Sequence, residues 1–207
     1  MSFDHVSWIE VFGFVTGAVN VWLLARQNIW NWPIGIANNL AYLILFATSG
    51  LYGDAGLQAV YIALAVYGWQ LWLRGGGGSS LPLLPVTRTS VTTWKYLVPA
   101  AVVSAVFLRW FLSRFTDSTV PGWDGATTAL SLAATYGQCR KLLESWWLWI
   151  LVDLIYIPLY LYKGLWLTAL LYFVFLLLCI FGLREWHREL SGAMQPKPGE
   201  HAADLLR

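Results

Sequence analysis

One apolar stretch of this chain carries an acidic residue among four aromatic ones. They are Trp146, Trp149, Asp153, Tyr156 and Tyr160. Their separations of 3, 4, 3 and 4 positions place all five on one face of an α-helix. Trp and Tyr rings beside a carboxylate suit a flat cationic ring, since each cation–π contact contributes roughly 0.5–2 kcal/mol. This face is therefore predicted to bind such a solute.

The same face has a second interpretation, an aromatic belt at the membrane surface. Trp and Tyr gather where a membrane helix leaves the bilayer, and Trp146 and Trp149 stand at the start of the apolar stretch. A belt leaves Asp153 unexplained, because an acid at the centre of a membrane helix costs roughly 2.5–3.5 kcal/mol and is functional by default. Binding accounts for the whole pattern.

The aromatic and acidic face belongs to one copy of an internal repeat. Residues 10–72 align without a gap with residues 124–186, at a shift of 114 positions. The identical pairs include residue types that chance rarely aligns, among them Arg26/Arg140, Trp32/Trp146, Tyr42/Tyr156, Gly68/Gly182 and Trp72/Trp186. Internal repeats of membrane segments are a signature of transporters.

The two copies differ where the predicted site lies. Trp149 aligns with Gly35, and Asp153 aligns with Asn39. One half is therefore bulky and acidic where the other is open and neutral. This asymmetry suits a solute with one aromatic end and one end that forms hydrogen bonds.

A third segment adds polar and aromatic candidates. Gln58 and Tyr61 share one face of it, with Trp69 beside that face. Gln supplies a donor and an acceptor for hydroxyl groups. Asn39 and Gln58 could instead hydrogen-bond a neighbouring helix, as membrane amides often do. The predicted binding residues are thus Trp146, Trp149, Asp153, Tyr156, Tyr160, Asn39, Gln58, Tyr61 and Trp69.

The composition places these segments in a membrane. Of the 207 residues 58% are hydrophobic and only 12% are charged, and the mean hydropathy is +0.57. Soluble domains are nearer one quarter charged, so this chain needs a bilayer as its solvent. The net charge of +2 is small and scattered, which gives no reason to expect a nucleic-acid partner. No nucleophile motif, pair of buried acids or metal-binding cluster suggests an enzyme, a metal or a cofactor.

Seven membrane segments are expected, at about 8–24, 30–49, 56–73, 96–115, 124–138, 146–162 and 165–183. They divide the chain into a first three-helix bundle (8–73), a flexible Gly- and Pro-rich loop (74–93), a linker helix with its following loop (94–123), a second three-helix bundle (124–186) and a loosely ordered polar tail (187–207).

The repeat and the charges predict an all-α architecture and its orientation. Equivalent helices are four apart, so both copies cross the membrane in the same direction. The expected fold is a 3+1+3 parallel repeat about an axis along the membrane normal, as in SWEET-type carriers, with substrate on that axis. An N-terminus outside and a cytoplasmic C-terminus put ten Lys and Arg residues inside and three outside.

Several longer strings resemble the Pnu family of bacterial vitamin transporters, most closely its nicotinamide riboside transporters. The resemblance covers nearly the whole membrane region and rests on 51–61, 67–72, 127–131, Arg140-Lys141, 144–153, 156–160 and 162–165. The family's W-x-x-W-x-x-x-D pattern maps onto Trp146, Trp149 and Asp153. Ser145 and Thr135 depart from the residues usual in the family.

The resemblance implies facilitated diffusion of an unphosphorylated vitamin across the bacterial inner membrane, with trapping by a cytoplasmic kinase. It favours nicotinamide riboside, and relatives take thiamine or riboflavin. A proton-coupled carrier that uses Asp153 is an alternative, and a non-transporting membrane scaffold is a third hypothesis. Besides the vitamin, the expected partner is membrane lipid, and a homo-oligomer is possible.

Overall fold

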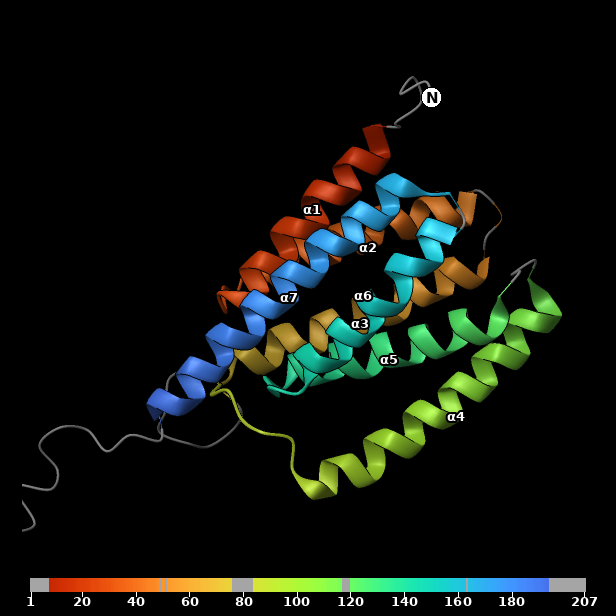
Figure 1. Cartoon of the computed structure of the whole chain (residues 1–207). Helices are drawn as coiled ribbons and strands as arrows, with labels where there is room; N and C mark the ends of the chain where they lie inside the picture. The colour runs from red at the N-terminus through yellow and green to blue at the C-terminus, as the bar shows by residue number, and fades with distance from the viewer. Residues whose placement is uncertain are drawn as a thin grey trace, which may run out of the picture.

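The computed structural model describes residues 8–48, 50, 52–75, 84–116, 120–162 and 164–193, without the side chains of 8–13, 167 and 193. These residues form seven α-helices (Figure 1). They are α1 (Trp8–Ala25), α2 (Asn31–Thr48), α3 (Tyr52–Leu73), α4 (Val91–Phe115), α5 (Pro121–Cys139), α6 (Ser145–Tyr162) and α7 (Trp166–Ala193).

Six of the helices close into a ring. Helix α1 packs against α2, α2 against α3, α3 against α5, α5 against α6, α6 against α7, and α7 back against α1. Helix α4 lies at the outer edge, alongside α5 (Figure 1). Each ring helix therefore turns one face toward a common centre.

Helix α4 fits against α5 at a glycine. A Cβ atom on Gly125 would lie only 2.8 Å from the backbone nitrogen of Arg109, so the two backbones approach too closely for any side chain there. No residue of α4 is buried. Its exposed residues include Val102, Val103 and Phe107, which suit contact with lipid.

Hydropathy separates the helices into two kinds. In the described part of the chain, α4, α6 and residues 168–192 of α7 are long and apolar enough to cross a membrane by themselves. Residues 14–25 of α1 form a shorter apolar stretch. The other ring helices carry more polar side chains, and several of these face the interior of the ring.

The repeat is visible in the backbone. Gln27 and Lys141 are the two described non-glycine residues with positive φ, at 55° and 51°, and they are equivalent positions. Asn31 donates a side-chain hydrogen bond to the carbonyl of Asn28, and its equivalent Ser145 donates one to the carbonyl of Leu142. The two copies therefore turn into α2 and α6 with the same local geometry.

The same three-residue packing unit occurs once in each half. Trp32 meets Trp72 edge to face at 5.3 Å, and Trp146 meets Trp186 in the same way at 5.3 Å. The ring of the first Trp in each pair lies over a glycine of α3 or α7, and a Cβ there would come within 2.3 Å of Trp32 or 2.5 Å of Trp146. These units hold α2 on α3 and α6 on α7.

The two halves meet through equivalent residues. The rings of Trp72 and Trp186 lie 6.4 Å apart. The Nζ of Lys141 donates to Oε1 of Gln27 at 2.7 Å and stands 4.3 Å from the centre of the Trp72 ring. Burial lowers the pKa of the Lys141 amine, and the charge of Glu189 acts in the opposite direction. This junction lies at the end of the ring where α1 and α5 finish.

Four segment boundaries differ from the sequence prediction by three residues or more: α3 begins at Tyr52 rather than 56, α5 begins at Pro121 rather than 124, and the start of α4 and the end of α7 differ most. Helix α4 begins at Val91 rather than at 94–96, because the Ser90 side chain caps it by accepting a hydrogen bond from the Thr93 nitrogen at 3.1 Å. Helix α7 continues through 187–193, which were expected to belong to a loose tail. Its last turns bury Trp186 and pack Leu190 against the core.

The loop expected at 74–93 is ordered over its described second half. Val86 is buried, the Thr87 nitrogen donates to the Lys141 carbonyl at 3.0 Å, and the Leu143 nitrogen donates to the Thr87 carbonyl at 2.9 Å. This backbone pairing ties the segment to the α5–α6 connection. Residues 76–83 lie outside the described part.

Candidate functional site

A cavity of about 410 Å³ occupies the centre of the ring. All six ring helices line it, and α4 contributes nothing. Its lining combines amide, hydroxyl and aromatic side chains with one carboxylate. A mostly apolar, concave site with a few polar groups is the usual form of a small-molecule site.

Six of the nine predicted binding residues line this cavity. They are Trp149, Asp153 and Tyr156 on α6, Asn39 on α2, and Gln58 and Tyr61 on α3. The face predicted from helical spacing on α6 therefore points in part to the centre of the ring.

The other three predicted residues lie outside the cavity lining. Trp146 is fully buried between Gly182 and Trp186, because the missing side chain at Gly182 leaves the space for its ring. Tyr160 stacks on Tyr172 at 5.2 Å. Trp69 is partly buried and packs against the Trp core. We therefore assign these three to packing around the site.

Asp153 is the acidic group of the cavity. Its side chain is only 2% exposed, and its Oδ2 has no hydrogen-bond partner among the described residues. The Cys179 thiol lies beside the carboxylate, and both line the cavity. The Nε1 of Trp149 is likewise shielded without a partner in the described part. Unsatisfied buried polar atoms at a cavity wall indicate a missing ligand or water.

An amide-rich wall faces the cavity from α1 and α2, and sequence reasoning identified only part of it. Asn20, Asn31 and Asn38 line the cavity in addition to Asn39. Asn38 donates to the Thr16 hydroxyl at 2.6 Å, whereas Oδ1 of Asn20 is shielded with no partner among the described residues. The signal that could have found them is the presence of amides within apolar helices of one repeat only.

The repeat makes the two walls chemically different. Asn20 aligns with Ala134, Asn38 with Val152, and Gln58 with Tyr172. Five of the six amides in the lining therefore belong to the first copy, with Gln138 the exception, whereas the carboxylate belongs to the second copy and the aromatic rings come from both. Amide groups therefore predominate on the side of the first copy, and the acidic group lies on the side of the second copy.

Helix α5 adds hydroxyl groups between these walls. Thr127 and Thr135 donate to backbone carbonyls one turn earlier, at 2.8 Å each, as expected for Thr within a helix. Thr128, Ser131 and Thr135 nevertheless line the cavity. Small hydroxyl side chains thus allow close packing of α5 and also present polar atoms to the interior.

Three tyrosines pack together on the α6–α7 side. Tyr172 lies 4.8 Å from Tyr156 and 5.2 Å from Tyr160, measured between ring centres. The hydroxyl groups of Thr127 and Tyr156 are hydrogen-bonded to each other at 2.8 Å. This cluster holds the Tyr156 ring in place at the cavity wall.

A ring of helices around a central cavity that holds a few polar groups suits a membrane protein that binds a small solute. The profile of the nicotinamide mononucleotide transporter family matches residues 7–188. The chain belongs to this family, and it is a membrane transporter and not an enzyme.

The known relatives are also transporters, but their names give different substrates. The chain is 29% identical over 186 residues to the riboflavin/roseoflavin transporter RibM of Streptomyces davaonensis, covering 88% of this chain and 86% of RibM. It is 24% identical over 204 residues to the nicotinamide riboside transporter PnuC of Escherichia coli, covering 87% and 85%. The PnuC of Neisseria mucosa is 25% identical over 201 residues, covering 89% and 73%.

A solved structure has the same fold. The crystal structure of the vitamin B3 transporter PnuC superposes with a TM-score of 0.70 at 24% identity, covering 91% of this chain and 84% of that chain. The resemblance to the Pnu family that the sequence predicted is therefore confirmed.

Proposed function

We propose that this protein is a passive carrier for a vitamin with a flat aromatic ring and a hydroxylated sugar-like part, and that nicotinamide riboside is its substrate. The observation that carries the proposal is the combination of two features: a carboxylate oxygen on Asp153 that has no partner among the described residues, and the amide side chains of α1, α2 and α3 that line the cavity. Each wall matches one end of such a molecule.

The aromatic end is assigned to the α6 wall. A buried carboxylate in a membrane helix is stable only with a partner, and a pyridinium ring supplies the positive charge. Trp149 and Tyr156 line the cavity on the same helix as Asp153, which suits stacking of a cationic ring. The ribose hydroxyls and the carboxamide then find donors and acceptors on Asn20, Asn39 and Gln58.

Riboflavin is a second candidate, favoured by the relative RibM, which is 29% identical over most of both chains. Its ring system is neutral and its ribityl chain carries several hydroxyls, so the amide wall would contribute more and Asp153 would serve as an acceptor. Thiamine, a flat cation without a sugar, would use the α6 wall and leave the amide wall largely unpaired.

The proposal also includes the parallel-repeat architecture. Trp72 and Trp186 are equivalent residues and contact each other, and so do Gln27 and Lys141. Contacts between equivalent residues are what a twofold axis through the ring would produce, and they support an axis along the membrane normal with the substrate near it. The N-terminus is proposed to be outside, on the Lys and Arg bias.

Rejection of phosphate would give uptake its direction. The described cavity lining contains Asp153 and no Lys or Arg. A phosphorylated vitamin would place an unpaired anion there, which is costly in a buried site. Phosphorylation by a cytoplasmic kinase would then trap the vitamin inside without an ion gradient.

Calorimetric titration of the purified protein tests the proposal. Nicotinamide riboside should bind, its 5′-phosphate should bind far more weakly, and thiamine and riboflavin should rank below nicotinamide riboside. Tighter binding of riboflavin would select the second candidate, and comparable binding of the phosphorylated form would refute both the site and the trapping step.

A charge-neutral variant separates the roles of Asp153. Asp153→Asn removes the charge that would pair with the pyridinium and should weaken nicotinamide riboside about 10- to 100-fold, the equivalent of the roughly 1.5–3 kcal/mol of a charge-assisted contact. Neutral riboflavin should be weakened less, because Asn keeps an acceptor oxygen. Uptake into liposomes with and without a proton gradient tests the coupled alternative. Accumulation that requires the gradient and disappears in Asp153→Asn would replace passive transport by proton coupling.

A further inference from the structure

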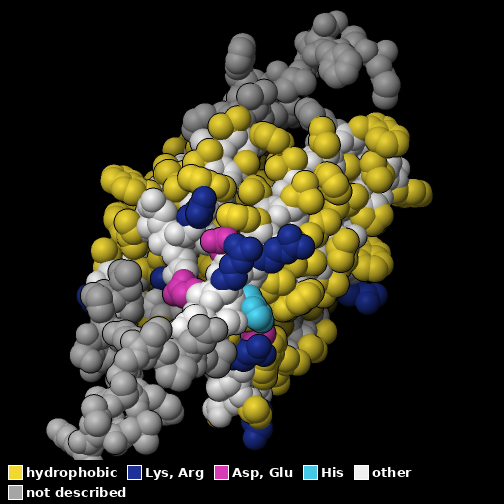
Figure 2. Space-filling view, turned by 60° about the vertical axis from the view of Figure 1, so that its left-hand side comes forward, with side chains coloured by type: hydrophobic (Ala, Val, Ile, Leu, Met, Phe, Trp, Pro, Cys, Tyr) yellow, Lys and Arg dark blue, Asp and Glu magenta, His cyan; other side chains and the backbone are white. Residues whose placement is uncertain are grey.

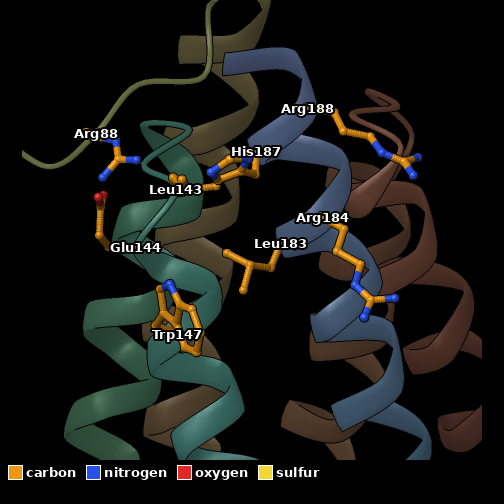
Figure 3. A pocket seen from close by; sticks show the side chains of 8 residues that line it. All are labelled: Arg88, Leu143, Glu144, Trp147, Leu183, Arg184, His187 and Arg188. Atoms are coloured by element: carbon orange, nitrogen blue, oxygen red, sulfur yellow. The ribbon is translucent and has the colours of Figure 1, made fainter. Parts of the chain in front are cut away.

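A second pocket lies outside the ring, at the end where α6 begins and α7 continues past the bundle (Figure 3). Its volume is about 550 Å³, and it shares no lining residue with the central cavity. Arg88, Glu144, Trp147, Leu183, Arg184 and His187 form most of its wall. They come from four places in the chain: the segment before α4, the α5–α6 connection, the start of α6 and the last turns of α7.

The pocket has an excess of positive charge. Its acidic residue, Glu144, already accepts hydrogen bonds from the backbone nitrogen and the hydroxyl of Thr89, at 2.7 Å each. Arg188 pairs with Glu185 at 3.2 Å. Arg88 and Arg184 form no ion pair within the described part of the chain. Two guanidinium groups are therefore available to an anion.

The basic groups lie on both sides of α7. Figure 3 shows Arg88 near Glu144 and His187 close to Leu143, whereas Arg184 extends from the other side of α7, away from Trp147. Figure 2 shows Lys, Arg and His side chains gathered with some Asp and Glu side chains in one area bordered by hydrophobic side chains. The arrangement suits a large anionic group at the edge of an apolar surface better than a small ion.

The floor of the pocket is apolar and continues along the outside of α6. Trp147 is 59% exposed, and Leu151 and Leu154 on the same face of α6 are 46% and 52% exposed. These residues are spaced four and three apart, so they form one stripe down the helix. Trp at such a position is typical of the boundary between lipid tails and headgroups.

We propose that this pocket binds the headgroup of an anionic phospholipid. Arg88 and His187 contact the phosphodiester beside Trp147, and Arg184, on the other side of α7, adds to the positive potential that attracts the anionic headgroup. The acyl chains lie along the stripe formed by Trp147, Leu151 and Leu154. The charge excess explains the preference for an anionic lipid, and the continuous apolar stripe explains why the phosphate belongs to a lipid and not to a soluble metabolite.

The bound lipid would hold the end of α7 beside the segment that contains Arg88. That segment pairs through Thr87 with the α5–α6 connection, next to the junction of Lys141 with Gln27. A headgroup here would therefore brace the end of the ring at which the two halves meet. The inference does not depend on which vitamin the central cavity carries.

Native mass spectrometry of the detergent-solubilised protein tests the site, with phosphatidylglycerol and phosphatidylcholine as probes. Each juxtamembrane Arg contributes about 1 kcal/mol, so the double variant Arg88→Gln with Arg184→Gln should bind phosphatidylglycerol about 30-fold more weakly. The matched control is Arg109→Gln with Arg114→Gln on exposed positions of α4, which removes the same charge elsewhere and should bind as the unaltered protein does.

Competition distinguishes the two sources of phosphate. Inorganic phosphate and glycerol 3-phosphate, added at concentrations well above that of the lipid, should leave phosphatidylglycerol bound. Displacement by either would overturn the lipid assignment in favour of a soluble phosphate ester. Equal loss of lipid in the control variant would show general charge attraction, and equal binding of phosphatidylcholine would show that the contact does not depend on the charge of the headgroup. Either result would overturn the site itself.

Discussion

Replacing Gly182 by alanine should destabilise the second half of the protein, because Trp146 occupies the space that a methyl group would need. A Cβ on Gly182 would lie 2.5 Å from Cη2 and Cζ2 of Trp146 and 2.8 Å from Cε2. The indole has no room to retreat, since it is fully buried and packs edge to face on Trp186 at 5.3 Å. A ring or a helix must therefore move.

The size of the effect follows from two opposing terms. Overpacking a close-packed site costs about 1–3 kcal/mol, and contacts this short on a rigid ring place the cost near the upper end. Alanine in place of glycine within a helix gains about 1 kcal/mol. The net loss is about 2 kcal/mol, which corresponds to a Tm about 4–8 °C lower for a chain of this size.

Thermal unfolding in detergent, followed by tryptophan fluorescence, measures this loss. Gly68→Ala should behave alike, since its Cβ would lie 2.3 Å from Trp32. Gly56→Ala is the control, because nothing lies within 4 Å of a Cβ there. In the Gly182→Ala background, Trp146→Phe should recover part of the stability, since the smaller ring makes room. A Tm for Gly182→Ala equal to that of the control would contradict the close packing of Trp146 on Gly182.

Two further predictions concern the site and the orientation. Trp149→Ala should weaken substrate binding roughly 2- to 30-fold, the equivalent of a stacking contact of about 0.5–2 kcal/mol. The control, Trp147→Ala on the outer face of α6, should leave substrate binding unchanged. Calorimetry measures both affinities, and equal affinities would place Trp149 in a membrane-surface belt. A reporter enzyme fused after Arg207 should be active in the cytoplasm, as the Lys and Arg bias requires, and activity confined to the periplasm would reverse the proposed topology.

The tertiary structure divides the α6 motif between two roles. Trp146 and Trp149 are three residues apart, which is about 60° around a helix, so periodicity assigns them to one face. The Trp146 ring packs against Gly182, which lies on α7, far from Trp146 in the sequence. Helical spacing carries no information about the partner helix, and only the packing of α6 on α7 reveals that Trp146 faces that helix while Trp149 faces the cavity.

For a similar reason, the sequence did not predict that Asn20 and Asn38 line the cavity. Each membrane Asn is equally compatible with a hydrogen bond to a neighbouring helix and with a ligand contact. Closure of the ring brings Asn20 and Asn38 to the same cavity as Asp153, and their different pairing becomes visible only there: Asn38 bonds to Thr16, whereas Oδ1 of Asn20 has no partner among the described residues.

The repeat, the membrane class, the family and most of the aromatic and acidic wall could be predicted from the residues alone. These features depend on residue type and on spacing within one helix or between two copies, both of which can be read along the chain. The tertiary structure decided which residues pack and which face the cavity, where α4 and α7 begin or end, and how a basic pocket forms from four separate segments. Those features depend on contacts between residues far apart in the chain, which local periodicity does not encode.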